Sequence, residues 1–278
     1  MSDRLIITGT VVAVMFAAML LLERRFPLRE QRDPKLPRLG RNLTLAVLSL
    51  IVGQAAALFL LVRVAAFVES HDLGVVRFIP SPGMRLLVAF LLLDYTLWWW
   101  HWMSHKVPFL WRFHLVHHID RDLDASTALR FHFGEHALSI LFRSVQIIVI
   151  GASAEAVWVW QTILFASILF HHANVRLPYR TERWLVRFVV TPRMHGIHHS
   201  DHRDEANSNW SSILSCWDYL HRTALLCVPQ SDVVIGVPAY QKDEGVKLAT
   251  ILMVPFVRQR ADWDGRTEAR CTGTVLAG

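Results

Sequence analysis

The chain has only three cysteines among its 278 residues, and Cys216, Cys227 and Cys271 form no C-x-x-C pair. Their spacing therefore does not indicate a thiolate metal site. Because the topology argued below places all three on the cytoplasmic side, we expect no disulfide. The sequence also lacks internal repeats, low-complexity tracts, the H-E-x-x-H motif of zinc peptidases and any evident haem- or flavin-binding domain.

Charged residues are nearly absent from four long segments, which are residues 5–22, 43–68, 86–103 and 137–170. A run of about 18 apolar residues is long enough to cross a bilayer. The last segment is long enough for a hairpin of two spans. We therefore predict an all-α, multi-pass integral membrane protein, built as a helical bundle.

The first apolar segment runs through Leu20, Leu21 and Leu22 directly into Glu23 and Arg24, without the small-residue site that a cleaved signal peptide needs. It is interpreted as a retained membrane anchor.

The loops before and after the second predicted span differ in their number of basic residues. The loop after the second span, residues 69–83, contains only Arg77. The loop after the first span contains seven basic residues: Arg24, Arg25, Arg29, Arg32, Lys35, Arg38 and Arg41. The positive-inside rule places this first loop in the cytoplasm. Anionic lipid headgroups, and not nucleic acid, are the expected contacts of these charges.

Thirteen of the fifteen histidines lie between His101 and His202. The sets are His101-x3-His105, His114-x2-His117-His118, His132-x3-His136, His171-His172 and His195-x2-His198-His199. In a helix, spacings of three and four put side chains on one face, so each H-x-x-H-H set is expected to present three imidazoles together. Imidazole binds zinc, copper, iron and nickel. The sets exceed what one tetrahedral ion needs, so two metal ions are predicted, on a histidine-rich helical cap at the cytoplasmic ends of the spans.

Carboxylates near these sets are expected to orient the rings. Asp94 lies two helical turns before His101, and an acid buried in a span needs such a partner. The further candidates are Asp120, Glu135, Asp201 and Asp218. Solvent exposure is the preferred interpretation for Asp122, Asp124 and Glu205.

The ordered motifs resemble the fatty acid hydroxylase/sterol desaturase superfamily of membrane di-iron oxygenases. The resemblance covers roughly residues 90–222. It is carried by H-K-V-P-F-L-W-R-F-H-L-V-H-H (residues 105–118), S-T-A-L-R-F-H (126–132), F-H-H-A-N-V-R-L-P (170–178), M-H-G-I-H-H-S (194–200) and N-S-N-W followed by W-D-Y-L (207–220). It implies two iron ions and the ligands His101, His105, His114, His117, His118, His195, His198 and His199, with His132 and His172 as additions. His136, His171 and His202 are less favoured.

The resemblance implies an O2-dependent oxidoreductase that hydroxylates or desaturates a lipid C–H bond, with electrons from a separate donor protein. Four alternatives remain. They are an acyl-chain desaturase, a non-enzymatic membrane metal-binding protein, a bis-histidine haem protein and a zinc peptidase using the H-x-x-E-H element at residues 132–136. The H-x-x-H-H spacing argues against the last two, because each leaves most of the histidines without a role.

Three regions are expected along the chain. Residues 1–85 form anchor helices and the basic loop, residues 86–222 form the catalytic region, and residues 223–278 form a cytoplasmic tail. The tail is polar from about Gln259 onward and is expected to be loosely ordered.

Overall fold

The structure is a computed structural model that describes residues 2–260, 263 and 266–276, without the side chains of residues 2, 52–59, 62, 243 and 244. Its longer helices are α1 (Ser2–Arg25), α2 (Lys35–Ser70), α3 (Pro82–Lys106), α4 (Pro108–His118), α5 (Phe133–Ile150) and α6 (Ala154–His172). The short ones are α7 (Tyr179–Leu185), α8 (Pro192–His198), α9 (Arg203–Ala206), α10 (Cys216–Leu220) and α11 (Leu248–Met253). Five 3-10 turns complete it: η1 (Val75–Phe78), η2 (Thr127–Leu129), η3 (Pro238–Tyr240), η4 (Asp243–Val246) and η5 (Val254–Phe256). In the described residues, β-pairing is limited to isolated bridges, so the all-α prediction is confirmed.

Among the residues that the structure describes, three helices are long and apolar enough to cross a membrane: Asp3–Arg25 of α1, and α5 and α6 in full. They correspond to the predicted anchor and to the two halves of the predicted hairpin. Residues 63–78 and α3 pass the same test only as a pair, bent by 85° at the break between them. The predicted span at residues 43–68 is helical within α2, but many of its side chains fall outside the described residues.

The α5–α6 turn depends on glycine. Gly151 ends α5 with φ +82°, a left-handed conformation that side chains with a Cβ rarely adopt. A Cβ on Gly151 would lie 2.4 Å from the carbonyl oxygen of Leu73, and one on Gly74 would lie 2.1 Å from the amide nitrogen of Gly151. The two glycines therefore allow the hairpin to approach the loop after α2.

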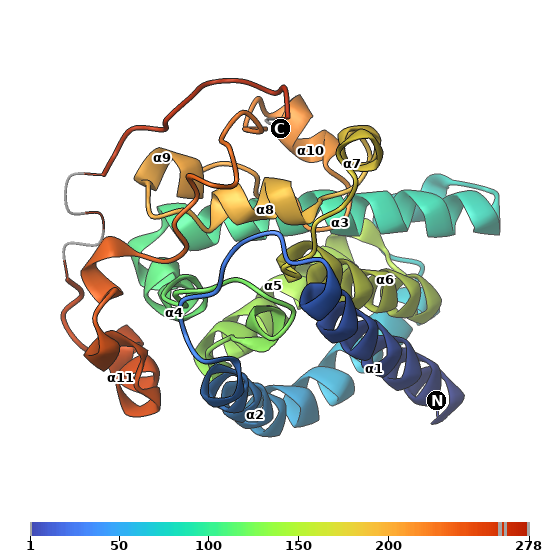
Figure 1. The fold of residues 1–278 in the computed structure, drawn as a ribbon. Coiled ribbons are helices and arrows are strands. Elements are labelled where there is room, and N and C mark those ends of the chain that lie inside the picture. Colours follow the sequence, from blue (N-terminus) through green and yellow to red (C-terminus); the bar gives the residue numbers. More distant parts are fainter. Residues whose placement is uncertain (1, 261–262, 264–265, 277–278) are drawn as a thin grey trace.

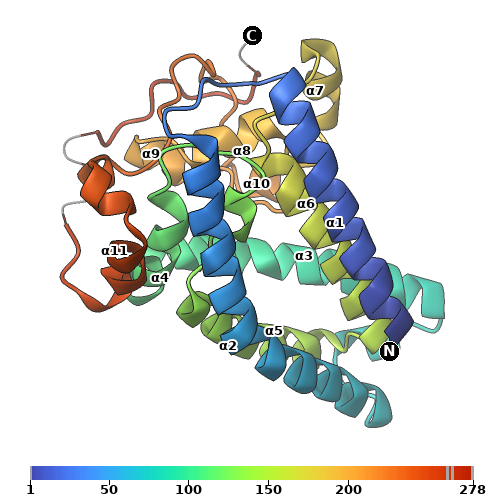
Figure 2. The ribbon, with the colours of Figure 1, turned by 60° about the horizontal axis from the view of Figure 1, so that its bottom comes forward.

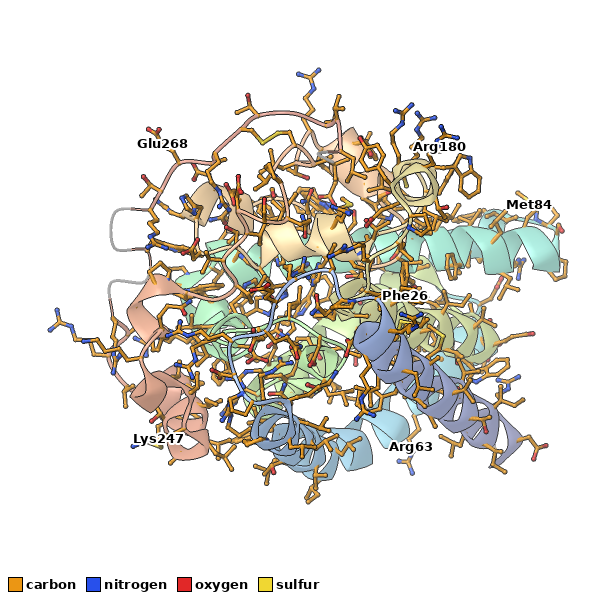
Figure 3. All side chains as sticks on the ribbon, in the orientation of Figure 1. Phe26, Arg63, Met84, Arg180, Lys247 and Glu268 are labelled. Carbon is orange, nitrogen blue, oxygen red and sulfur yellow. A yellow bond between two sulfur atoms is a disulfide. The ribbon has the colours of Figure 1, made fainter. Side chains whose placement is uncertain are left out.

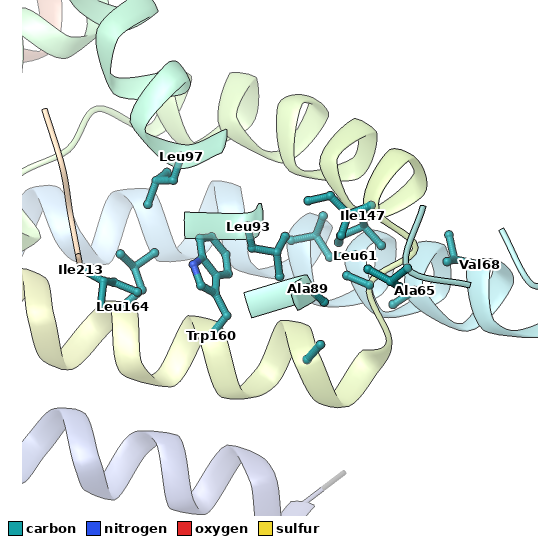
Figure 4. Close-up of a cluster of buried hydrophobic side chains, with 14 of the residues drawn as sticks. Leu61, Ala65, Val68, Ala89, Leu93, Leu97, Ile147, Trp160, Leu164 and Ile213 are labelled. Atoms are coloured by element: carbon teal, nitrogen blue, oxygen red, sulfur yellow. The ribbon is translucent and has the colours of Figure 1, made fainter. Parts of the chain in front are cut away.

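The main apolar core lies between α2, α3, α5 and α6 (Figure 4). Leu61 and Ala65 of α2 meet Leu93 of α3, Ile147 of α5 and Trp160 of α6. This packing fixes the four helices relative to one another, and with them the end of the bundle that carries the histidines.

The cap is made of short helices gathered at one end of the bundle, where α8 and α9 lie beside the basic loop that follows α1 (Figures 1 and 2). The loop and the cap are joined by a buried ionic network. Arg38 is fully buried and forms ion pairs with Asp120, Asp122 and Asp124. The expectation that Asp122 and Asp124 are solvated is therefore wrong, because they neutralise a buried guanidinium.

Glu205 is likewise buried and not solvated, because it pairs with Arg270 of the C-terminal segment at 2.6 Å. In the described part of the tail, the amide of Leu226 donates to the carbonyl oxygen of Gly273, and the side chain of Leu276 is buried. The expectation of a loosely ordered tail is thus wrong for these residues. The tail has internal partners on the cap that composition does not reveal.

Cys227 and Cys271 form a disulfide with an S–S distance of 2.06 Å (Figure 3). The expectation of no disulfide is wrong. The two residues are 44 positions apart in sequence, and they meet only because the tail folds back over the apolar cluster of Leu123, Ile197 and Leu225. Cys216 is free and exposed.

Candidate metal centre

The fold brings nine of the ten predicted ligands into two groups. The first is His101, His105, His114, His118 and His198, and the second is His117, His172, His195 and His199. Within each group, one nitrogen from every ring lies within 4.8 Å of the others. Helices α3, α4 and α8 supply the first group, and α4, α6 and the end of α8 supply the second.

The two H-x-x-H-H sets are each divided between the groups. On α4, His114 and His118 are four residues apart and face the first group, whereas His117 faces the second. On α8 the division is reversed, since His198 joins the first group while His195 and His199 join the second. The expectation that each set presents three imidazoles to one place is corrected here. Adjacent helical residues point about 100° apart, so each helix can serve two sites.

The ring nitrogens are arranged as metal ligands would be. In the second group, Nε2 of His172 lies 3.0 Å from Nε2 of His117 and 3.0 Å from Nε2 of His195. Nε2 of His199 lies 3.1 Å from that of His195. Nitrogens that bind one ion at about 2.1 Å, at right angles, are about 3 Å apart. The donor set therefore fits a metal ion.

Unpartnered nitrogens give the same result for the first group. The Nε2 atoms of His105, His114, His118 and His198 are buried without a hydrogen-bond partner. A buried polar atom without a partner is costly unless a ligand satisfies it. Four such atoms converging from three helices fit a bound cation.

The other nitrogen of several rings is fixed by a hydrogen bond, which selects the tautomer and orients the ring. Nδ1 of His101 donates to the carbonyl oxygen of Trp210 at 2.7 Å, and Nδ1 of His198 donates to that of Ser208 at 2.7 Å. In the second group, Nδ1 of His172 donates to its own helix, at Ile168, at 2.7 Å. Sequence analysis missed these partners because backbone carbonyls carry no residue-type signal.

Glu135 is the predicted carboxylate that directly contacts a ring of the two groups, since its Oε1 lies 2.8 Å from Nδ1 of His114. Asp94 instead accepts hydrogen bonds from the Leu214 amide and the Trp217 indole, so the expected pairing with His101 is wrong. Asp218 acts one step further away. It accepts a hydrogen bond from the amide of Trp210, and the carbonyl oxygen of Trp210 accepts the hydrogen bond from Nδ1 of His101.

Asp120 and Asp201 have other partners. Asp120 pairs with Arg38, while Asp201 pairs with Arg266 and with Nδ1 of His202.

The rings on the cap are held in the neutral form that binds metal. Burial, with a smaller effect from neighbouring imidazoles, lowers the pKa of His117, His118 and His198 well below its usual value. The same causes lower the pKa of His195 and His199. These rings therefore need no deprotonation before a cation binds.

His132 is the one predicted ligand that lies outside both groups. Its Nδ1 accepts a hydrogen bond from the Gly134 amide at the start of α5, and its Nε2 lies 3.3 Å from the carbonyl oxygen of Leu252. His171, less favoured from sequence, lies beside the second group with its ring centroid 4.1 Å from that of His195.

Residues 86–223 match the family model described as Fatty acid hydroxylase. An ornithine lipid hydroxylase from Rhizobium tropici is 30% identical over 139 residues, which are 50% of this chain and 41% of that protein. Alkylglycerol monooxygenase from Homo sapiens is 30% identical over 49% of this chain and 29% of that protein. Cholesterol 25-hydroxylase from Mus musculus is 28% identical over 48% of this chain and 44% of that protein.

The match therefore spans less than half the length of each of these relatives. No solved structure matches the chain.

Proposed function

Because the chain belongs to the fatty acid hydroxylase/sterol desaturase superfamily, we propose that it is a membrane-bound di-iron oxygenase acting on a lipid C–H bond. It hydroxylates or desaturates its substrate with O2 and with electrons from a separate donor protein. The observation that carries the proposal is the pair of histidine groups at one end of a membrane helical bundle. Residues 86–222 are assigned as the catalytic region, after the anchor of residues 1–85 and before the C-terminal region of residues 223–278.

The nine grouped histidines are proposed to hold the two iron ions. Iron held there would, with electrons from the donor protein, supply the chemistry that reduces O2 to an oxidant able to remove hydrogen from an unactivated C–H bond. The protein residues hold and shield this site. Glu135 and the backbone carbonyls fix the rings, and burial keeps bulk water away from most of them. His101 and His105 of α3 are the two half-buried members of the groups, and the other seven histidines are buried.

We expect membranes that contain the protein and a reductant to convert a lipid in an O2-dependent reaction. Under 18O2, hydroxylation places one labelled oxygen atom in the product, whereas desaturation gives an unlabelled product lacking two hydrogens. Comparative lipid mass spectrometry of cells with and without the chain identifies the product. A metal-loaded, folded protein that leaves every lipid unchanged would support a metal-binding role instead.

The metal site is proposed to face the cytoplasm, where reduced electron donors are available. The basic loop and the cap lie on one side of the membrane, since Arg38 of α2 is buried against Asp120 of the cap. The excess of basic residues in this loop favours the cytoplasmic side. The Cys227–Cys271 disulfide is instead more typical of an oxidising compartment.

Single cysteines at the exposed positions Arg32, Ser81 and Arg180 test the topology, in a background with the native cysteines replaced by serine. With a membrane-impermeant thiol reagent on intact cells, we expect labelling only at position 81. The other two positions should label after the cells are lysed. Labelling of positions 32 and 180 in intact cells would place the metal site on the opposite face.

A further inference from the structure

Arg143 is a cationic residue in the middle of α5, which is one of the helices able to span a membrane. It lies on the inner face of the helix, three residues after Ile140 and four before Ile147, both of which are buried in the main core. Its guanidinium carbon is 5.5 Å from the ring centroid of Trp160 on α6. Figure 4 shows Trp160 pointing from α6 toward Leu93 in this core. Arg143 as a whole is half-buried, with its Nε inside the bundle.

The guanidinium lacks an anionic partner among the described residues. Nε of Arg143 is buried without a hydrogen-bond partner, and no described carboxylate lies within ion-pair distance of it. The indole Nε1 of Trp160, on the facing helix, is also buried and unpartnered. Two donors from two helices therefore converge on one region without an acceptor.

Without a bound anion, this arrangement would destabilise the core. A cation at membrane depth is costly unless it is paired, and such residues face the bundle interior where they meet substrates or ions. The face of the Trp160 ring offsets only part of the cost. An oxyanion between the two side chains would neutralise Arg143 and accept hydrogen bonds from both donors.

Building on the proposed function, we propose that Arg143 and Trp160 bind the anionic group, a carboxylate or a phosphate, of an acidic lipid substrate. On α6, eleven residues separate Trp160 from His171, a rise of about 16 Å. His171 lies beside the second histidine group. The oxidised carbon is therefore far along the acyl chain from the anionic group, and not adjacent to it.

Binding is tested with the full-length protein in nanodiscs of neutral lipid, with radiolabelled oleate, oleyl alcohol and lysophosphatidic acid as probes. We expect the wild type to bind an anionic probe about ten times more tightly than the alcohol, the effect of one charge-assisted hydrogen bond. Comparison of oleate with lysophosphatidic acid distinguishes a carboxylate from a phosphate. Arg143→Gln should abolish the preference for the anionic probe, and Arg143→Lys should retain part of it. Trp160→Phe keeps an aromatic ring but removes the indole N–H, so it should weaken the preference.

Arg25→Gln, at an exposed position outside the core, is the matched control and should keep the preference. Arg143→Gln should also leave the melting temperature unchanged or raise it, because it removes an unpaired buried charge. Equal binding of acid and alcohol by the wild type would overturn the proposal, as would a preference that survives in Arg143→Gln. Because binding does not depend on turnover, an active protein without the preference would refute only this site. A protein with the preference but without turnover would refute only the oxygenase function.

Discussion

We expect His198→Ala and His117→Ala each to abolish lipid turnover while leaving membrane insertion intact. His198 belongs to the first histidine group and His117 to the second, so each substitution removes a proposed ligand from a different ion. Metal analysis of the purified, fully loaded wild type should give about two ions per chain, and each variant should give about one. Activity is measured in membranes, and metal content is measured on folded protein.

His71→Ala is the control, because His71 is exposed at the end of α2, away from both groups. It should retain both metal ions and full turnover. Near-normal activity in either ligand variant would remove that histidine from the proposed site. One ion or none per chain in the loaded wild type would refute the two-metal interpretation.

Arg38→Met is expected to be the most destabilising substitution outside the histidine groups. It would leave Asp120, Asp122 and Asp124 buried without their shared cation. Breaking a buried ion pair from one side costs about 3–5 kcal/mol. Thermal unfolding of the purified protein should show a large decrease in melting temperature.

Arg38→Met should also disturb the second histidine group. Asn42, one turn after Arg38, accepts a hydrogen bond from Nη1 of Arg130, and the Arg130 carbonyl oxygen accepts one from Nδ1 of His117. We therefore expect Arg38→Met to bind less metal as well. Arg25→Met, at an exposed arginine, is the control and should change neither property. An unchanged melting temperature for Arg38→Met would show that the network does not stabilise the cap.

The sequence alone predicted the three helices that are long and apolar enough to cross a membrane, at residues 5–22 and in the two halves of 137–170, and the residue type that gathers at the site. An uncharged run such as residues 5–22 satisfies its own backbone as a helix, so its location depends on local composition. Histidines four residues apart share a helical face wherever that helix lies, and His101/His105, His114/His118 and His195/His199 each stay in one group. Nine of the ten ligands predicted from these patterns and from the family resemblance lie together in the structure.

Tertiary structure decided how these residues are paired. Periodicity gives the direction of a side chain about its own helix, but not the position of the next helix. The division of each H-x-x-H-H set between two groups could therefore not be derived from spacing. His132 illustrates the same limit. Its motif resembles a ligand element, but in the structure it begins α5 and contacts the carbonyl of Leu252, 120 positions away.

The partners of the buried charges and of the cysteines were also decided by tertiary structure. Asp122 and Asp124 were expected to be exposed because acidic residues in a polar segment usually are. Arg38 reaches them from 84 to 86 positions away, and Cys271 reaches Cys227 across 44 positions. Contacts between residues so distant in sequence depend on how the whole chain packs, and no local pattern of residues encodes them.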